Sequence, residues 1–483
     1  MFMDEARIQN SLVRRAFWLV VGFSFLIFFA QTRSFKLLVD ALTFTAIAKN
    51  ILSTGDWKTL HFSPDAYADF YMHPPLAMWL QALIFKYFGF SEPMSRALSS
   101  GTGVLSVAIV FAFTRRFFNL AGATWAAVVL FTSTRFIKWG TNFYFDGIIG
   151  FFILAGICSW LFAIRNREEL TIKEALFAFV GGISFAAAFM TKGVVCFSGV
   201  AVAAFALLLF FSRKNLIKFS LLLLGIALPF WIWFQWGDGL QYLKYYFSQS
   251  VAGRAQTHEF YNHPWVNLKS VWLPWWPIML LAYAHFIYRC IQRKFEEADR
   301  ITLVILLLAL SFPIAFSLGI TYYEHYLTPF YPIAAIMTGV QLSRFGFFSK
   351  VTERGVKIGY GILLCSSLYV ATIAPSFHMV KDLEPMWWVH EIENLPKAEQ
   401  ARIKTIAFTD KATNIWYGMA NILGKTNFKT SASFNLSRES MNDTILFTTR
   451  DETPLPSWKR VPCIYVDGYR AYASESLHLC ENL

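Results

Sequence analysis

Eleven long apolar runs dominate the pattern of hydrophobic and polar positions along this chain. Each run is long enough to cross the roughly 30 Å hydrocarbon core of a bilayer as a helix. The runs occupy residues 16–33, 95–114, 119–138, 145–164, 174–191, 194–212, 217–236, 272–288, 301–319, 326–343 and 357–375. The pattern therefore predicts a mainly α fold, a polytopic helical membrane bundle of about eleven spans.

Basic residues concentrate in alternate connections between these runs, which sets the predicted orientation. Lysine and arginine favour the cytoplasmic side of a membrane. With the N-terminus in the cytoplasm, the connections on that side contain Arg115 and Arg116; Arg165, Arg167 and Lys173; Arg213, Lys214 and Lys218; Arg289, Arg293, Lys294 and Arg300; and Arg344, Lys350, Arg354 and Lys357. The first run lacks a cleavage signature, so we interpret it as an uncleaved signal anchor.

Two stretches between the first and second spans predict shorter helices. Counting residues 74–90 as a further span would invert every later loop, so we expect a helix lying at the outer interface, opened by its proline pair. Residues 40–54 predict a second short helix, ended by Gly55. Two large outer loops result, at about 34–94 and 237–271, whereas the cytoplasmic loops are short. A functional site is therefore expected on the outer face.

The composition changes after about residue 376 to a mixed polar pattern. Alternating stretches there predict strands at 402–410, 443–451 and 463–473, and a helix at 412–423. We predict two domains, a transmembrane domain at 1–375 and a small α/β domain outside the membrane at 376–483. Cys463 and Cys480 would share an oxidising compartment there, and a disulfide and two unpaired thiols are equal alternatives.

Composition and charge support a membrane protein and exclude a nucleic-acid partner. Hydrophobic residues make up 56% of the 483 residues and charged residues 15%, against about 25% charged in soluble domains. The net charge is +12, but the basic residues lie between apolar runs, where they serve topology. The six cysteines show no zinc spacing.

Two aspartates at the outer ends of predicted helices are candidate catalytic residues. Asp40 starts the first interfacial helix, where it could cap the helix or act as a base or hydroxyl-orienting group. Spacing alone favours the cap. Asp146 enters the very apolar fourth span, where capping again competes, but its burial must be offset by a partner. Arg135 and Lys138, at the end of the preceding span, could supply that partner.

Cationic, histidine and tyrosine side chains also gather on the predicted outer face. Lys192 lies beside Gly193 in a tight turn, where it could snorkel to the headgroups or bind a phosphate. Arginine suits phosphate through bidentate pairing, and one lies in the second large outer loop. The predicted substrate-binding residues are Lys192, Arg254, His73, His263, His325, Tyr322 and Tyr326.

Taken in order, these stretches resemble the lipid-linked-sugar glycosyltransferases of the GT-C fold. The similarity is to the branch with protein O-mannosyltransferases and lipid A aminoarabinose transferases, and it covers about residues 16–345. It rests on DALTFTAIAKNILSTGDW (40–57), HPPL (73–76), Asp146, MTKG (190–193), the PW pair before the eighth span and HYLTPFYP (325–332).

The resemblance implies a role for four of the candidate residues. Asp40 matches the acidic residue taken in this family as catalytic base or hydroxyl-positioning group, and Asp146 matches a second acidic position facing the site. Lys192 matches a lysine near the donor phosphate, and Arg254 is a looser match to a phosphate-contacting arginine.

Three departures from the family pattern concern the identity of the substrates. Ala41 replaces the second acid of a pair, Met72-His73 stands where the aminoarabinose branch has Glu-Lys, and Tyr322 stands where that branch has a lysine. These departures do not argue against glycosyl transfer, which remains the expected activity. They put an aminoarabinose donor and a lipid A acceptor in doubt.

The resulting hypothesis is an inverting hexosyl or pentosyl transferase in the plasma (inner) membrane. Its site would face the periplasm or other extracytoplasmic space. Its partners would be a polyprenyl-phosphate-linked sugar donor, a lipid, glycan or protein acceptor, and membrane lipids. The sequence contains no dedicated metal cage, and cationic side chains can neutralise the phosphate; a divalent cation is the alternative. The rival hypotheses are a lipid-linked-sugar flippase or transporter, and a non-catalytic assembly subunit.

Overall fold

A computed structural model of the protein describes most of the helical region and five strands. The described residues are 2–32, 39–62, 69–166, 169–236, 239–248, 281, 284–288, 291–292, 297–317, 324–344, 351–372, 405–408, 427–430, 444–449, 458–466 and 469–474. The chain groups into two compact units. The first comprises Met1–Arg33, Tyr71–Ala77 and Arg96–Phe377, and the second comprises Ser34–Phe70, Met78–Ser95 and His378–Leu483. The division at residues 375 and 376 stays a prediction.

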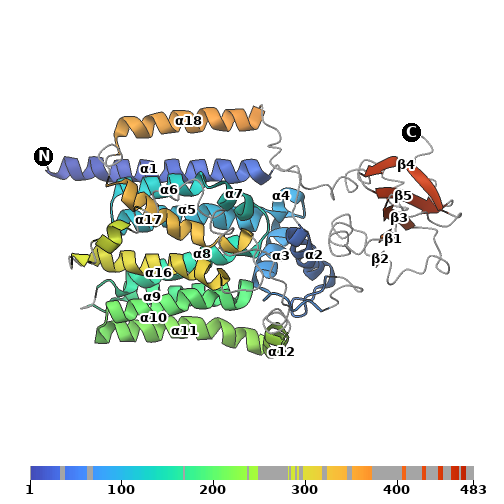
Figure 1. Ribbon diagram of the computed structural model, residues 1–483, viewed down its shortest axis with the longest axis horizontal. Helices are drawn as coiled ribbons and strands as arrows, with labels where there is room; N and C mark the ends of the chain where they lie inside the picture. Colours follow the sequence, from blue (N-terminus) through green and yellow to red (C-terminus); the bar gives the residue numbers. More distant parts are fainter. Residues whose placement is uncertain are drawn as a thin grey trace. The chain divides into compact units, whose positions relative to one another are not determined.

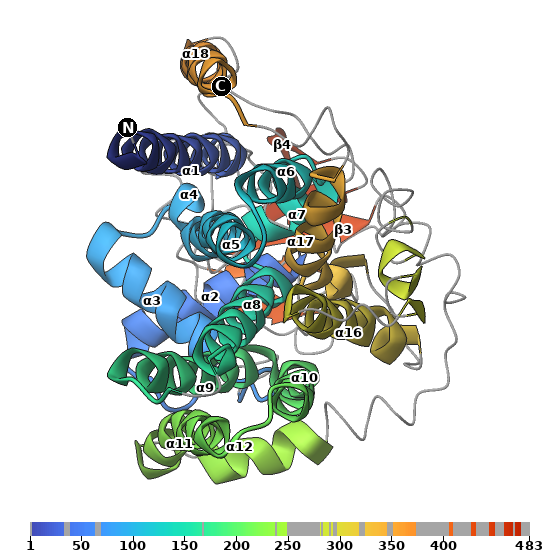
Figure 2. The same cartoon turned by 90° about the vertical axis from the view of Figure 1, so that its left-hand side faces the viewer.

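The first unit is a bundle of long apolar helices that run side by side (Figures 1 and 2). Every predicted apolar run coincides with a described helix or helix pair, except 272–288, most of which lies outside the described residues. The helices and short 3-10 turns are α1 (Phe2–Thr32), α5 (Ala97–Phe117), α6 (Leu120–Phe131), α7 (Thr134–Thr141), α8 (Phe145–Ile164), α9 (Ile172–Lys192), η1 (Gly193–Cys196), α10 (Phe197–Leu209), α11 (Arg213–Trp236), α12 (Gly239–Tyr245), α16 (Glu297–Ser317), η3 (Glu324–Leu327), α17 (Phe330–Leu342) and α18 (Glu353–Thr372).

Several of these helices are long and apolar enough to cross a membrane. By length and composition the described residues contain five such helices, or six if α6 and α7, bent by 65°, form one span. The segment Ile172–Leu209 counts as one of the five. The protein is therefore a multi-pass helical membrane protein, as the apolar pattern predicts.

The segment Ile172–Leu209 reverses direction at Gly193. Gly193 has φ +75°, which glycine adopts without strain. A Cβ added to Gly199 would lie 2.8 Å from the Phe185 ring. Those two residues would be roughly 20 Å apart along a continuous helix. The segment is therefore two antiparallel helices, α9 and α10, in agreement with the two separate runs predicted there.

The second unit contains the two predicted short helices, α2 (Val39–Thr54) and α3 (Leu76–Phe88), followed by α4 (Glu92–Ser95). The first two residues of α3 are grouped with the first unit. Gly55 ends α2 with φ +73°. The amide of Asn50 donates to the carbonyls of His61 and Phe62, both at 2.9 Å. The indole of Trp79 donates to the Trp57 carbonyl at 2.8 Å. These side-chain hydrogen bonds hold residues 57–62, the segment that follows α2, against α2 and α3.

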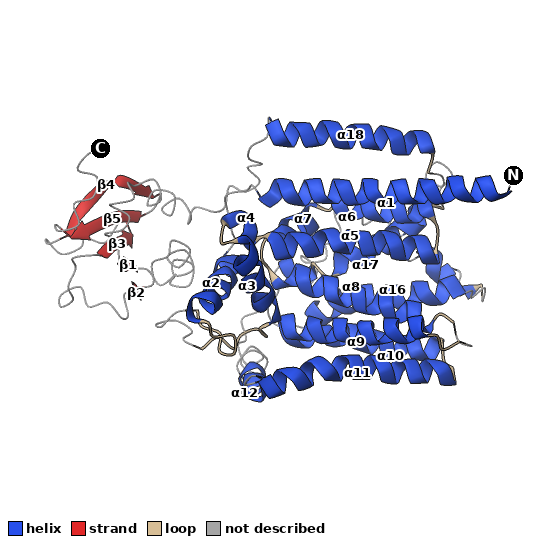
Figure 3. Cartoon of the chain, turned by 180° about the vertical axis from the view of Figure 1, so that it is seen from behind, coloured by secondary structure: helices blue, strands red, loops and turns tan. Residues whose placement is uncertain are grey.

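The second unit also contains a five-stranded sheet (Figure 3). Its strands are β1 (Thr405–Phe408), β2 (Asn427–Thr430), β3 (Thr444–Thr449), β4 (Trp458–Val466) and β5 (Tyr469–Ser474), in the order β2-β1-β3-β5-β4. β1 is parallel to both of its neighbours, and β5 is antiparallel to β3 and β4.

The predicted strands at 402–410 and 443–451 are confirmed by β1 and β3. The strand structure predicted at 463–473 is also confirmed, but it is divided between the end of β4 and most of β5. The Asp-Gly pair at 467–468 favours a two-residue hairpin turn, and the prediction overlooked it. The helix predicted at 412–423 lies outside the described residues.

Candidate functional site at the start of α8

Asp146 lies in the first turn of α8 and is almost completely buried, with 2% of its surface exposed. The helix begins after Tyr144, which occupies the N-cap position with extended backbone and no side-chain cap bond. Asp146 therefore does not cap the helix. A carboxylate this buried costs free energy unless it is paired and hydrogen-bonded.

Lys192 is the described partner of that carboxylate. Its ammonium donates to Asp146 Oδ1 at 2.5 Å, and the two side chains are only 11% and 3% exposed. Lys192 is the last residue of α9, so the reversal at Gly193 brings its side chain to the start of α8. This geometry contradicts the snorkelling interpretation, because the ammonium is directed at Asp146. The pairing is also non-local, unlike the one suggested for Arg135 or Lys138.

The turn that carries Lys192 is held by a residue that the sequence did not single out. Tyr246 donates its hydroxyl to the Lys192 carbonyl at 3.3 Å and accepts from the Val194 amide at 3.2 Å. A Cβ on Gly193 would overlap that hydroxyl. Glycine is thus required at position 193 both by its backbone conformation and by the close approach of Tyr246.

His325 approaches the second oxygen of the carboxylate. Its Nε2 lies 3.8 Å from Asp146 Oδ2, and that oxygen is buried without a hydrogen-bond partner among the described residues. The imidazole packs against the rings of Tyr144 and Trp139, with centroids 4.8 and 5.3 Å away. Burial, and then the charge on Lys192, lower the pKa of His325 to about 2. The imidazole is therefore neutral at physiological pH.

Two more of the predicted substrate-binding residues border this cluster. The Lys192 ammonium lies 4.4 Å from the centre of the Tyr326 ring, a cation–π distance. His73 meets Phe145 edge to face at 5.3 Å, next to Asp146 in the chain. The structure thus brings Asp146, Lys192, His325 and Tyr326 together, with His73 at the margin.

Other predicted residues fall elsewhere. Arg254, His263 and Tyr322 lie outside the described residues. Asp40 is half-buried in the first turn of α2, in the second unit. Trp139, Tyr144 and Tyr246 also contribute to the cluster around Asp146, and the sequence did not predict them. The aromatic cluster WGTNFYFD, which ends at Asp146, was the available signal for the first two.

The chemistry of this cluster suits an organic or phosphate ligand better than a metal ion. Among the described residues, no group of three or more histidine, cysteine or acidic side chains gathers as metal ligands do. Asp146 and His325 are two such ligands, but Lys192 already neutralises the carboxylate. The cluster therefore presents an ammonium, a neutral imidazole and aromatic faces, all largely withdrawn from water.

Comparisons with known proteins indicate which fold surrounds this cluster. Residues 72–233 match the family described as dolichyl-phosphate-mannose-protein mannosyltransferase. That range includes His73, Asp146 and Lys192. It also includes the turn at Gly193 that joins α9 to η1.

A curated relative from Pseudomonas fluorescens is 24% identical over 342 residues, which is 66% of this chain and 54% of the relative. It is an undecaprenyl phosphate-alpha-4-amino-4-deoxy-L-arabinose arabinosyl transferase. The match therefore spans about half of that relative's length.

Two solved structures of ArnT from Cupriavidus metallidurans have a similar fold. The form bound to undecaprenyl phosphate has a TM-score of 0.70 at 14% identity, covering 95% of this chain and 98% of that one. The apo form has a TM-score of 0.67 at 13% identity, covering 95% and 97%. Nearly the whole chain therefore has the fold of that protein.

Proposed function

We propose that this chain, a GT-C fold protein of the aminoarabinose transferase and protein mannosyltransferase branch, is a membrane glycosyltransferase. It would move a sugar from a polyprenyl-phosphate carrier to an acceptor on the outer face of the membrane. The observation that carries the proposal is the buried Lys192–Asp146 pair at the start of α8. It fixes a cation in a poorly hydrated site, on a fold shared with a protein that binds undecaprenyl phosphate.

In the proposed reaction an acceptor hydroxyl attacks the anomeric carbon of the donor sugar. Asp40 orients that hydroxyl or takes its proton as the new glycosidic bond forms. The bond from the anomeric carbon to the phosphate oxygen breaks, and the electron pair leaves with the lipid phosphate. Direct displacement inverts the anomeric centre. Activation resides in the lipid phosphate, so the step needs no nucleotide.

Lys192 and Arg254 are the proposed partners of the departing phosphate. Charge grows on that phosphate in the transition state, where fixed cations in a water-poor site stabilise it most. An ammonium has three N–H donors, and the bond to Asp146 uses one of them. Asp146 would therefore hold Lys192 in place, and the neutral His325 beside it would offer an uncharged hydrogen-bonding group.

The length of α8 supports the outer-face location of this chemistry. Asp146 lies in the first turn of α8, a helix of 20 residues, and Arg165 directly follows its last residue. A helix of that length spans roughly 30 Å, the thickness of the hydrocarbon core. Basic residues favour the cytoplasm, so Asp146 belongs at the opposite, outer surface. The proposal keeps eleven spans, interfacial α2 and α3, and an extracytoplasmic C-terminal domain.

Asp40→Asn tests the proposal. Asp40 lies inside the first turn of α2, after Val39, so it is not the N-cap residue that the sequence suggested. Asparagine keeps the size and an acceptor oxygen of aspartate but lacks a basic carboxylate. We expect normal insertion and folding with a loss of transfer of about a hundred-fold or more, the usual scale for a positioned acid or base. The measurement is transfer of radiolabelled sugar from polyprenyl-phosphate donors by the purified protein.

Asp69→Asn is the matched control, since Asp69 is an exposed carboxylate of the same unit, with 58% of its side chain accessible. It should transfer sugar at the wild-type rate. Wild-type transfer by Asp40→Asn would remove Asp40 from the mechanism. No transfer by the unaltered protein with any donor, together with movement of a lipid-linked sugar across vesicles, would favour the transporter hypothesis.

A further inference from the structure

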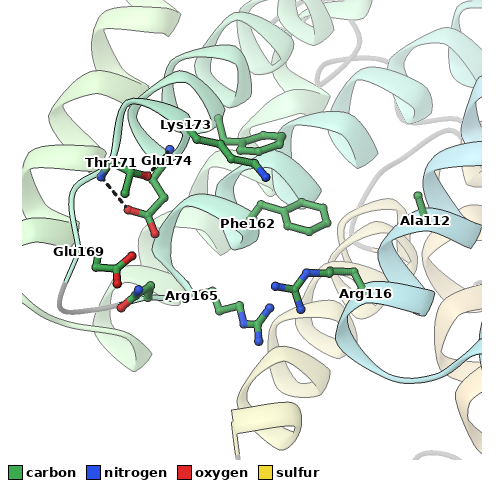
Figure 4. A pocket seen from close by; sticks show the side chains of 10 residues that line it. Ala112, Arg116, Phe162, Arg165, Glu169, Thr171, Lys173 and Glu174 are labelled. Atoms are coloured by element: carbon green, nitrogen blue, oxygen red, sulfur yellow. Dashed lines mark hydrogen bonds between the residues drawn. The ribbon is translucent and has the colours of Figure 1, made fainter. Parts of the chain in front are cut away.

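A pocket of about 830 Å³ opens beside the end of α8 that is remote from Asp146 (Figure 4). It is formed by the last turns of α5 and α8 and the start of α9. Its lining residues are Ala112, Arg116, Phe162, Arg165, Asn166, Glu169, Thr171, Lys173, Glu174 and Phe177. None of them takes part in the site at the start of α8.

Two arginines from different helices converge at this pocket. The guanidinium groups of Arg116, in the last turn of α5, and Arg165, which follows α8, point toward one another (Figure 4). The Arg165 guanidinium also lies 5.6 Å from the centre of the Phe117 ring. Like charges that face each other repel, and an anion between them removes that repulsion. Arginine pairs with phosphate oxygens in bidentate fashion.

Glu174, an acidic residue of the lining, is already paired with a cation outside the lining and so does not neutralise the cations that line the pocket. The carboxylate of Glu174 accepts from the Thr171 amide at 3.1 Å and pairs with the Lys218 ammonium at 3.3 Å. Lys218 is fully buried and also donates to the carbonyl of Ala163, in the last turn of α8, and to that of Asn166, just after the helix, both at 2.8 Å. Glu174 is thus committed to joining α8, α9 and α11.

The remaining charges on the pocket wall are mostly positive. Glu174 is paired with Lys218, and Glu169 is the other carboxylate among the described residues of the lining; it lies on the exposed surface. Arg116, Arg165 and Lys173 supply three cations against it. The described lining therefore favours an anionic ligand.

Aromatic rings line the apolar side of the same pocket. Phe162 stacks on Phe177 with centroids 5.4 Å apart and ring planes 24° apart. Phe117 adjoins Phe162 at 4.9 Å. A small soluble anion would use the charged rim alone. A ligand with a phosphate at one end and an apolar portion at the other matches both parts of the pocket.

We propose that this pocket binds the phosphate headgroup of an anionic phospholipid from the cytoplasmic leaflet. Basic pockets between membrane helices on the cytoplasmic side bind such headgroups. The leaflet follows from the proposed topology, because the pocket lies one helix length, roughly 30 Å, from Asp146. The lipid would tie the end of α5 to the α8–α9 connection and so fasten the half of the bundle opposite the transfer site.

The test measures lipid retention by the purified full-length protein, using native mass spectrometry with phosphatidylglycerol and phosphatidylcholine. The double variant Arg116→Gln/Arg165→Gln should retain phosphatidylglycerol at least ten-fold less well than the wild type. Retention of phosphatidylcholine should not change. Arg115→Gln is the matched control, because Arg115 also lies in the last turn of α5 but does not line the pocket. Equal retention by the double variant and the control would overturn the proposal.

A second double variant, Arg116→Lys/Arg165→Lys, separates a built site from attraction to a charged surface. Lysine keeps the charge but loses the bidentate fork. The proposed site therefore predicts clearly weaker phosphatidylglycerol retention in a protein with unchanged thermal unfolding. Wild-type retention would mean surface attraction only. Millimolar inorganic phosphate should compete poorly; complete displacement of the lipid by phosphate would overturn the assignment to a lipid headgroup.

Discussion

Asp146 and Lys192 face each other in a part of the protein from which water is largely excluded, with 3% and 11% of their side chains exposed. Removing one member of such a pair leaves an uncompensated buried charge, which typically costs about 3–5 kcal/mol. Removing both charges costs much less, because no ion is then left in the apolar surroundings. At the residue scale, the stability of this site therefore depends on the pair more than on either residue alone.

We expect Asp146→Ala to lower the free energy of unfolding by roughly 3–5 kcal/mol. The double variant Asp146→Ala/Lys192→Met should lose much less than the sum of the two single variants, since contacting residues are not additive. Reversible denaturant unfolding in detergent, followed by tryptophan fluorescence, measures these differences. Additive effects would mean that the two charges do not stabilise each other. Both proteins should lack transfer activity under the proposed mechanism.

Glycines allow helices to approach closely at two crossings in the first unit. A Cβ on Gly182 of α9 would lie 2.9 Å from the Gly225 Cα of α11. A Cβ on Gly339 of α17 would lie 2.6 Å from the Ala126 Cα of α6. Within lipid, helix association depends on such close packing, because apolar surface gains nothing by leaving lipid. At the element scale, small residues therefore set the spacing of the bundle.

Substitution of Gly182 by leucine should separate α9 from α11. Backbone atoms surround this position, so a side-chain rotation would not make room. Overpacking typically costs about 1–3 kcal/mol and occasionally more. Thermal unfolding of the purified protein should show the loss. Gly101→Leu is the matched control, because nothing lies within 4 Å of a Cβ at that α5 position. Equal melting temperatures for both variants would contradict this account of the packing.

The two ends of α8 differ in charge, and at the scale of the whole molecule this difference supports the proposed orientation in the membrane. Asp146, paired with Lys192, lies at one end. Arg165, with Arg116 and Lys173 nearby, lies at the other. Lysine and arginine favour the cytoplasmic side of a membrane, so the proposed orientation puts this second end in the cytoplasm.

Single cysteines introduced into a cysteine-free version of the chain should reveal this orientation. Gln241→Cys and Thr430→Cys should react with an impermeant thiol reagent added to intact cells, because both positions are expected outside. Glu296→Cys should react only after the membrane is opened. Gel shift of the labelled chain measures the modification. The reverse labelling would place the Asp146 cluster in the cytoplasm and rule out an outer-face site.

The sequence by itself determined the features that arise from local physical properties. Apolar runs located the helices, basic clusters set the proposed orientation, and Gly55 marked the end of α2, because burial in lipid and backbone conformation act over a few neighbouring residues. The order of the motifs also identified the family resemblance, which the comparisons confirm.

Only the tertiary structure decided which side chains meet. Asp146, Lys192 and His325 come from α8, α9 and η3, and the sequence suggested nearby Arg135 or Lys138 as partner for Asp146. Only the folded chain shows that the Tyr246 hydroxyl donates a hydrogen bond to the Lys192 carbonyl and so stabilises the turn at Gly193. Ion pairs and ring contacts form between residues that are distant in sequence. Local periodicity places a residue on its helix but does not specify which other helix it will contact.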